Sequence, residues 1–416
     1  MAGMQADPPT PAPRLIDRRW LGIIGLASLV AIPAIVVTMA YVGSVNALTD
    51  VVWVQLPAAL GLPRPVVVLG IPIIGGLVVG TFIRYVPGHG GPEPAAGHGL
   101  GGDEHEHPPA LPGVIVASIL SLVAGASLGP EGPLVTIIGG IGSLVALRLA
   151  LPTQVARLLT LSGVSSLTAG IFGSPLASGL LLAETAPLAG LELYRRIIPA
   201  LAAGTVGYVI LAAISGPSIQ PIFAVVPSVS LGDHLAAAAI GVLGGIGGTL
   251  YIEGFHRVRG WSAPLDRSPI LKAAIGGAIV GLVALTAGEV TLFSGEHEIY
   301  DVVDQAGTLG ASGLAVVFVG KVIASLASLA TGFRGGRIFP VMFLGGVLGL
   351  LVSAVIPAVP APVAVAAGMG ATGVAVLRIP LFMVILAGIF TSPDLVSVIL
   401  VAVVTSYAVT VGRREL

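Results

Sequence analysis

The sequence predicts an all-α integral membrane protein, built as two repeats of tilted and broken helices. Of its 416 residues, 55% are hydrophobic and only 9% are charged, whereas a soluble domain carries about 25% charged residues. Several apolar runs approach the ~20 residues that a helix needs to cross a bilayer. The 59 glycines and 32 prolines interrupt many of these runs. Such breaks persist in a membrane only where protein or a polar cavity surrounds the freed backbone.

The apolar runs predict membrane spans along most of the chain. Clear examples are residues 21–42, 65–83, 112–128 and 271–290. Basic residues near spans favour the cytoplasmic side, and they cluster before the first run and at Arg413 and Arg414. We therefore expect both termini to be cytoplasmic. The Pro-rich start and the long first run do not have the form of a cleavable signal peptide.

Two ordered matches at nearly one offset predict an internal repeat. Gly129–Pro133 and Gly336–Pro340 both read Gly-x-x-x-Pro and are both followed by paired glycines; they lie about 207 residues apart. Many transporters are built from such internal repeats. Ser174–Leu176 matches Ile379–Leu381 at about 205. The expected organisation is a disordered cytoplasmic tail 1–19, a first membrane repeat 20–215, a linker 216–232, a second membrane repeat 233–411 and a basic tail 412–416. The offset alone leaves open whether the repeats are inverted.

Composition excludes several kinds of site. Cysteine is absent, so disulfides, thiolate metal sites and a cysteine nucleophile are excluded. The net charge of -1 gives no sign of nucleic-acid binding. Residues 98–107 hold several histidines and acids in a Gly/Pro-rich loop, without helical metal-ligand spacing, and are better interpreted as a solvated acidic loop. No metal and no cofactor are expected. The glycines at 244–248 favour close helix packing over nucleotide binding.

Gly129–Pro133 is the strongest local feature. Proline is tolerated in the first turn of a helix, so Pro130 and Pro133 mark a helix start after the apolar run that ends at Leu128. The free N–H groups of such a start, at membrane depth, form an anion site. Residues 335–340 are expected to aim a second helix start at the same point. Two such ends would hold an anion without full positive charges, which would bind it too tightly for conduction.

Glu131 lies inside the first of these helix starts. A charged side chain costs at least ~2.5 kcal/mol at the bilayer centre, so the carboxylate needs a physical reason. One interpretation is a carboxylate that only caps its own helix. The other is a gate that occupies the anion site and leaves it when protonated or displaced.

These motifs resemble those of the chloride channel (CLC) family. Gly129–Pro133 is similar to Gly-(Lys/Arg)-Glu-Gly-Pro, whose glutamate is the external gate, and Gly336–Pro340 to the later Gly-x-Phe-x-Pro motif. Gly88–Pro92 resembles Gly-Ser-Gly-Ile-Pro, and Ser174–Ala177 followed by Glu184 resembles Ala-Pro-Leu-Ala-Gly and its acidic end. The resemblance covers residues 20–411. Within the family, the motifs look most like those of a bacterial branch of ion-transport proteins.

The resemblance implies two inverted repeats and a homodimer in a bacterial inner membrane, with one pore per subunit. It also implies that chloride or another small anion is held by backbone N–H groups. Here the residues for that role are His89, Gly90, Gly129, Gly132, Arg337, Ile338 and Phe339. His89, or Gly90 with a small shift, stands where the family has its central serine. An imidazole could donate to the anion, although a loop histidine is often only solvated.

Departures from the family pattern bear on proton coupling. Thr185 stands where the exchangers have their inner proton glutamate, and a hydroxyl cannot carry a proton as a carboxylate does. Glu184 could act as the proton site instead. The family's central tyrosine lies on a final helix that is not expected here, and no cytoplasmic nucleotide-binding module is expected.

Two basic residues lie near the expected pore. Lys321 falls in an apolar run, where it could attract anions to a vestibule or neutralise a buried acid. Arg334, like Arg337, flanks the second helix start and could attract anions, or it could extend to the lipid headgroups.

The leading hypothesis is therefore channel-like anion transport gated by Glu131. Proton-coupled exchange of chloride or fluoride is the alternative within the same class. A membrane-embedded enzyme is the alternative of another class, and it is disfavoured because no nucleophile has a base at a dyad spacing. We do not expect an enzyme.

Overall fold

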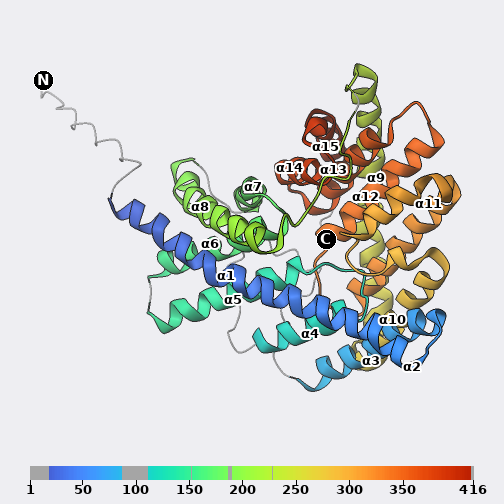
Figure 1. Ribbon diagram of the computed structural model, residues 1–416, viewed down its shortest axis with the longest axis horizontal. Helices are drawn as coiled ribbons and strands as arrows, with labels where there is room; N and C mark the ends of the chain where they lie inside the picture. Colours follow the sequence, from blue (N-terminus) through green and yellow to red (C-terminus); the bar gives the residue numbers. More distant parts are fainter. Residues whose placement is uncertain (1–17, 87–110, 151, 186–189, 227, 414–416) are drawn as a thin grey trace, which may run out of the picture.

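The computed structural model describes residues 18–86, 111–150, 152–185, 190–226 and 228–413, and these residues are almost entirely helical, without a β-strand (Figure 1). The helices of the first half are α1 (Arg18–Asp50), α2 (Leu56–Leu60), α3 (Arg64–Tyr85), α4 (Leu111–Val123), α5 (Glu131–Arg148), α6 (Thr153–Ile171), α7 (Pro175–Thr185) and α8 (Gly190–Ser215). One π-helical turn, Val51–Gln55, joins α1 to α2.

The second half begins after an extended stretch that follows α8. Its helices are α9 (Leu231–Ser262), α10 (Pro269–Ala287), α11 (Glu298–Ala330), α12 (Ile338–Val355), α13 (Ala361–Leu377), α14 (Pro380–Phe390) and α15 (Val396–Thr410). Short 3-10 turns occur at Ala263–Arg267, Glu289–Thr291 and Pro393–Leu395. Ser230 and Asp233 form a capping box that starts α9.

Eight helices in the described ranges are long and apolar enough to cross a membrane. Large apolar side chains on them are exposed, such as Leu29 at 64%, Ile74 at 61% and Leu250 at 63%. An apolar surface of this kind suits lipid rather than water. The membrane assignment is therefore confirmed.

One apolar run does not form the single span that its length suggests. Of residues 112–128, only those up to Val123 are helical, in α4. Gly125 then has a φ of +81°, which glycine adopts without steric cost. The remaining residues lead irregularly into α5. The run is thus a half-membrane helix followed by a non-helical segment that is buried in protein.

The helix packing repeats between the two halves. Each neighbouring pair in the first half has a counterpart in the second: α5 packs on α6 as α12 does on α13, α1 on α8 as α9 on α15, and α6 on α7 as α13 on α14. Figure 1 shows the first half, in blue to green, beside the second, in yellow to red. α11 bends at Gly310, and its longer, C-terminal part is the counterpart of α4. The predicted repeat is confirmed.

The two repeats are inverted, and counterpart helices contact each other between them. α3 packs directly on α10, and α7 on α14. The α3–α10 contact is close: a Cβ on Gly277 would lie 1.9 Å from the carbonyl oxygen of Pro72. Small residues permit such an approach between membrane helices. The glycines of α9 serve the same purpose, since a Cβ on Gly244 or Gly248 would meet Ala371 or Ala375 of α13.

Candidate anion site

The site begins where the non-helical segments of the two repeats cross. Gly129 and Gly336 form an isolated antiparallel bridge, in which the Gly129 N–H donates to the Gly336 carbonyl at 2.9 Å and the reverse bond is also made. α5 starts two residues after Gly129, and α12 starts two residues after Gly336. The bridge therefore holds two helix N-termini beside each other, each with the positive end of its dipole at the site.

The carboxylate of Glu131 occupies the point where these ends meet. Its Oε1 accepts the backbone N–H of Ile338 at 2.7 Å, although the two residues come from different repeats. The side chain is only 4% exposed. Its Oε2 receives no hydrogen bond within the described part of the chain. An acidic side chain thus lies where an anion would be held, with one oxygen ligated and one still able to take a proton.

The fit around this carboxylate is tight. A Cβ on Gly129 would lie 1.9 Å from Oε2 of Glu131, and one on Gly336 would lie 2.2 Å from its Cδ. Gly132 lies against the backbone of Gly336. Because the Gly129 N–H is already used in the bridge, Gly129 shapes the site and does not present a free donor to an anion.

Two buried serines fix the segments that lead into the helix starts. Ser121 Oγ, from α4, accepts the N–H of Arg334 at 2.9 Å, and Ser328 Oγ, from α11, accepts the N–H of Ser127 at 3.1 Å. Each serine belongs to one repeat and holds the segment of the other. Neither serine was among the predicted site residues, although the two share the offset of the glycine motifs, and that offset is the signal that could have identified them.

Phe339 extends the site toward α14. Its ring lies 5.7 Å from the ring of Phe172 and 6.1 Å from that of Phe390. Phe172 also contacts Phe382 edge-on at 5.2 Å. Such offset and edge-on pairs are favourable beyond their buried area. A packed aromatic wall therefore connects the start of α12 with the start of α14.

Glu184 caps the start of α14 from the other repeat. Its two carboxylate oxygens accept the N–H groups of Leu381 and Phe382 at 2.8 and 2.9 Å. Thr185, next to it, donates its hydroxyl to the Leu181 carbonyl of its own helix. The structure thus places Glu184 at the N-terminus of α14, where Phe382 also joins the aromatic wall.

Lys321 is fully buried, and its Nζ donates to the carbonyls of Leu292 and Phe293 at 2.9 Å each. It also lies 4.7 Å from the centre of the Phe343 ring. The sequence left two roles open for this lysine, and both stay predictions; its Nζ binds backbone carbonyls of the loop before α11. Arg334 takes part through its backbone N–H, as described above.

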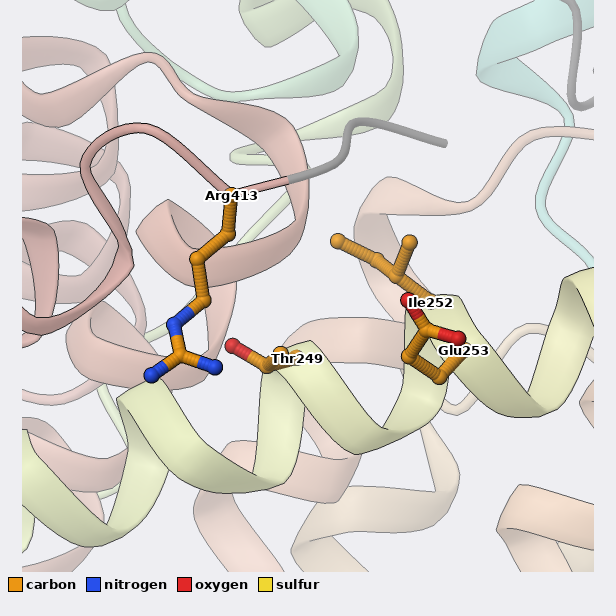
Figure 2. A pocket seen from close by; sticks show the side chains of 4 residues that line it. All are labelled: Thr249, Ile252, Glu253 and Arg413. Atoms are coloured by element: carbon orange, nitrogen blue, oxygen red, sulfur yellow. The ribbon is translucent and has the colours of Figure 1, made fainter.

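Some predicted residues cannot be placed. His89, Gly90 and the loop 98–107 lie outside the described residues. A cavity of about 390 Å³ lies elsewhere, between α9 and the residues after α15, lined by Thr249, Ile252, Glu253 and Arg413 (Figure 2). None of these four residues belongs to the site at the helix starts.

Broken helices of two inverted repeats that converge on a buried acid define an anion-transport type of membrane protein. The sequence matches the voltage gated chloride channel family over residues 67–411. It is 31% identical over 357 residues to the "Putative ion-transport protein YfeO" of Shigella sonnei (strain Ss046), covering 85% of this chain and 84% of that protein. It is 32% identical to the protein of the same name in Escherichia coli (strain SE11), covering 77% and 76%. The chain belongs to the voltage gated chloride channel (CLC) family.

Solved structures share its fold. A slow cyanobacterial Cl⁻/H⁺ antiporter superposes with a TM-score of 0.78 at 24% identity, covering 93% of this chain and 94% of that one. A CLC-type fluoride/proton antiporter superposes with a TM-score of 0.76 at 16% identity, covering 95% and 97%. At these identities the comparison establishes architecture.

Proposed function

We propose that this chain carries chloride-like anions across the cell membrane through a pore that Glu131 gates. The observation that supports this role is the hydrogen bond from the Ile338 N–H to Glu131 Oε1. A backbone donor at a helix start suits a permeant anion, and the carboxylate now fills its place. The proposed assembly is a homodimer with both termini cytoplasmic, as family membership suggests.

The gate works by competition. Ionised Glu131 satisfies the Ile338 N–H, so an anion cannot bind there. Protonation at the unligated Oε2 removes the charge that holds the side chain between the two helix starts. The carboxyl then leaves, and an anion takes the N–H donor. This mechanism makes anion flux depend on pH through one residue.

The test is chloride efflux from proteoliposomes for the parent, Glu131→Gln and Glu131→Ala, measured between pH 5 and 8. Both variants lose the ionisable group, so flux should become independent of pH and change at least about tenfold at the higher pH. Asp266→Asn is the matched control, because Asp266 is an exposed acid that pairs with Lys272 at the surface. Parent-like pH dependence in both Glu131 variants would exclude the gate.

We further propose channel-like transport without obligatory proton coupling. Thr185 offers only a hydroxyl where an inner proton carrier is needed, and both oxygens of Glu184 are engaged with backbone N–H groups. Coupled exchange remains the second candidate because the solved structures of this fold named above are antiporters. Recording anion efflux and pH together distinguishes the two. Proton movement driven by a chloride or a fluoride gradient would support exchange and exclude the channel.

A further inference from the structure

The loop between α10 and α11, residues 288–297, is fixed in place by a buried cation. Lys321 donates to two of its carbonyls, those of Leu292 and Phe293. A buried ammonium is stable only with such partners. Two hydrogen bonds from the buried Lys321 therefore hold the loop from inside the protein.

This loop touches both segments that build the gate. The Phe293 N–H donates to the carbonyl of Gly125 at 3.4 Å, in the segment that leads into α5. On the other side, a Cβ on Gly295 would lie 2.7 Å from Cβ of Phe343 in α12. The loop thus contacts the segment that leads into α5 and also α12, the helix that presents Ile338.

Two acids follow in the chain, and they differ in their surroundings. Glu298 Oε2 accepts the Gly295 N–H of the loop at 2.8 Å. Glu296 is partly exposed, and its own N–H is held by Ser294 Oγ at 3.2 Å. Glu296 is therefore a half-buried acid on the loop, directly after the residue that packs on α12.

Two acids act on the carboxyl of Glu296 through their charges, Glu131 of α5 and Glu298 of α11. His297 is its exposed neighbour in the loop. Burial, together with the negative charges of Glu131 and Glu298, raises the pKa of Glu296 to about 8. Near neutral pH the carboxyl thus holds a proton that it can give up.

We propose that Glu296 is a second proton-carrying residue of the site, which exchanges protons between the solvent at the α10–α11 loop and Glu131. This inference rests on the proposed gate role of Glu131. In the transfer, the O–H bond of the Glu296 carboxyl breaks and an O–H bond forms at Oε2 of Glu131. The pair holds one proton before and after, and Glu296 then takes a new proton from water.

The first test follows carboxyl protonation by infrared difference titration of the full-length protein in detergent. The parent should show a carboxyl that titrates near pH 8. The infrared band of this carboxyl should vanish in Glu296→Gln and persist in Glu296→Asp. In Glu131→Gln its midpoint should move to lower pH, because one negative charge near it is gone. A band unchanged in Glu296→Gln, or a midpoint unmoved in Glu131→Gln, would overturn the proposal.

The second test measures how fast anion flux responds to a pH jump in proteoliposomes. Glu296→Gln should slow that response at least about tenfold, Glu296→Asp should restore it, and Asp266→Asn should match the parent. Thermal melting confirms that each variant is folded. If flux in Glu296→Gln responds to the pH jump as fast as in the parent, while flux in Glu131→Gln is independent of pH, the Glu296 relay is overturned and the Glu131 gate stands. A parent-like Glu131→Gln would overturn the gate, and the relay with it.

Discussion

Gly336 illustrates how closely single residues are fitted at the site. It bridges to Gly129, and a Cβ in its place would overlap the Glu131 carboxyl group at 2.2 Å. A Cβ at less than 3 Å from another heavy atom forces one of the two to move. The side chain of Glu131 can move, whereas the bridge backbone is held from both repeats. The glycine is therefore required by the position of the carboxylate.

Gly336→Ala should push Glu131 off the Ile338 N–H and weaken the pH dependence of anion flux. Overpacking of this kind costs about 1–3 kcal/mol, so thermal melting should show a moderately less stable protein. Gly247→Ala is the matched control, because a Cβ there meets nothing within 4 Å. If Gly336→Ala kept the pH dependence and the melting temperature of the parent, the tight fit described here would be wrong.

The same scale shows what a sequence can and cannot predict about the site. Helix starts at Glu131 and Ile338 follow from proline and glycine positions, and convergence follows from the repeat. The surroundings of Lys321 and Glu296 were harder to predict from the sequence. Their roles depend on the path of an irregular loop, which no periodic pattern specifies, and a lysine that binds backbone carbonyls has no partner side chain to suggest it.

At the site, hydrogen bonds from the helices of each repeat hold the segments of the other repeat. Ser121 of α4 and Ser328 of α11 lie about 207 residues apart and bind backbone N–H groups of opposite repeats. A second pair repeats the pattern at the ends of the long helices: Tyr41 of α1 donates to Ser118, and Tyr251 of α9 bonds Ser325, each at 2.7 Å. These pairs show that the two-fold relation extends to individual hydroxyls.

Ser121→Ala and Ser328→Ala should each remove a hydroxyl that accepts a backbone N–H from the other repeat. An unsatisfied buried donor costs about 1–3 kcal/mol, and the repeat symmetry predicts similar losses for the two variants. Thermal unfolding in one detergent measures both.

Ser44→Ala is the control for this pair, since the exposed Ser44 hydroxyl bonds only a carbonyl of its own helix. It should melt like the parent. A large loss in one serine variant and none in the other would show that the two segments are not held equivalently.

At the scale of the whole molecule, neither repeat is self-sufficient. Glu131 binds Ile338, Glu184 binds the start of α14, and α3 lies against α10. The sequence predicted two repeats, because their offset is visible in it, and the limits near 215 and 232 stay a prediction. It did not predict that almost every polar contact at the site crosses between repeats, since such contacts depend on the relative orientation of the halves.

These contacts between the repeats predict that the chain still assembles and transports anions when it is cut between the two halves. Ile222 and Phe223 bond the end of α14, so the cut belongs after Val225, which is 86% exposed. Fragments 1–225 and 226–416, expressed together, should copurify through a tag on one of them and support chloride efflux, because exposed connections tolerate cleavage.

The control cut, after Leu243, divides α9 and should abolish assembly, since it exposes backbone groups that only a continuous spanning helix can satisfy. Expressed alone, fragment 1–225 should lack protected structure around Glu131, because the Ile338 donor and the partners of Ser121 and Ser127 belong to the other fragment. Hydrogen exchange at the start of α5 measures this directly. Protection there in the lone fragment, equal to that in the intact chain, would mean that the first repeat builds its half of the site without the second.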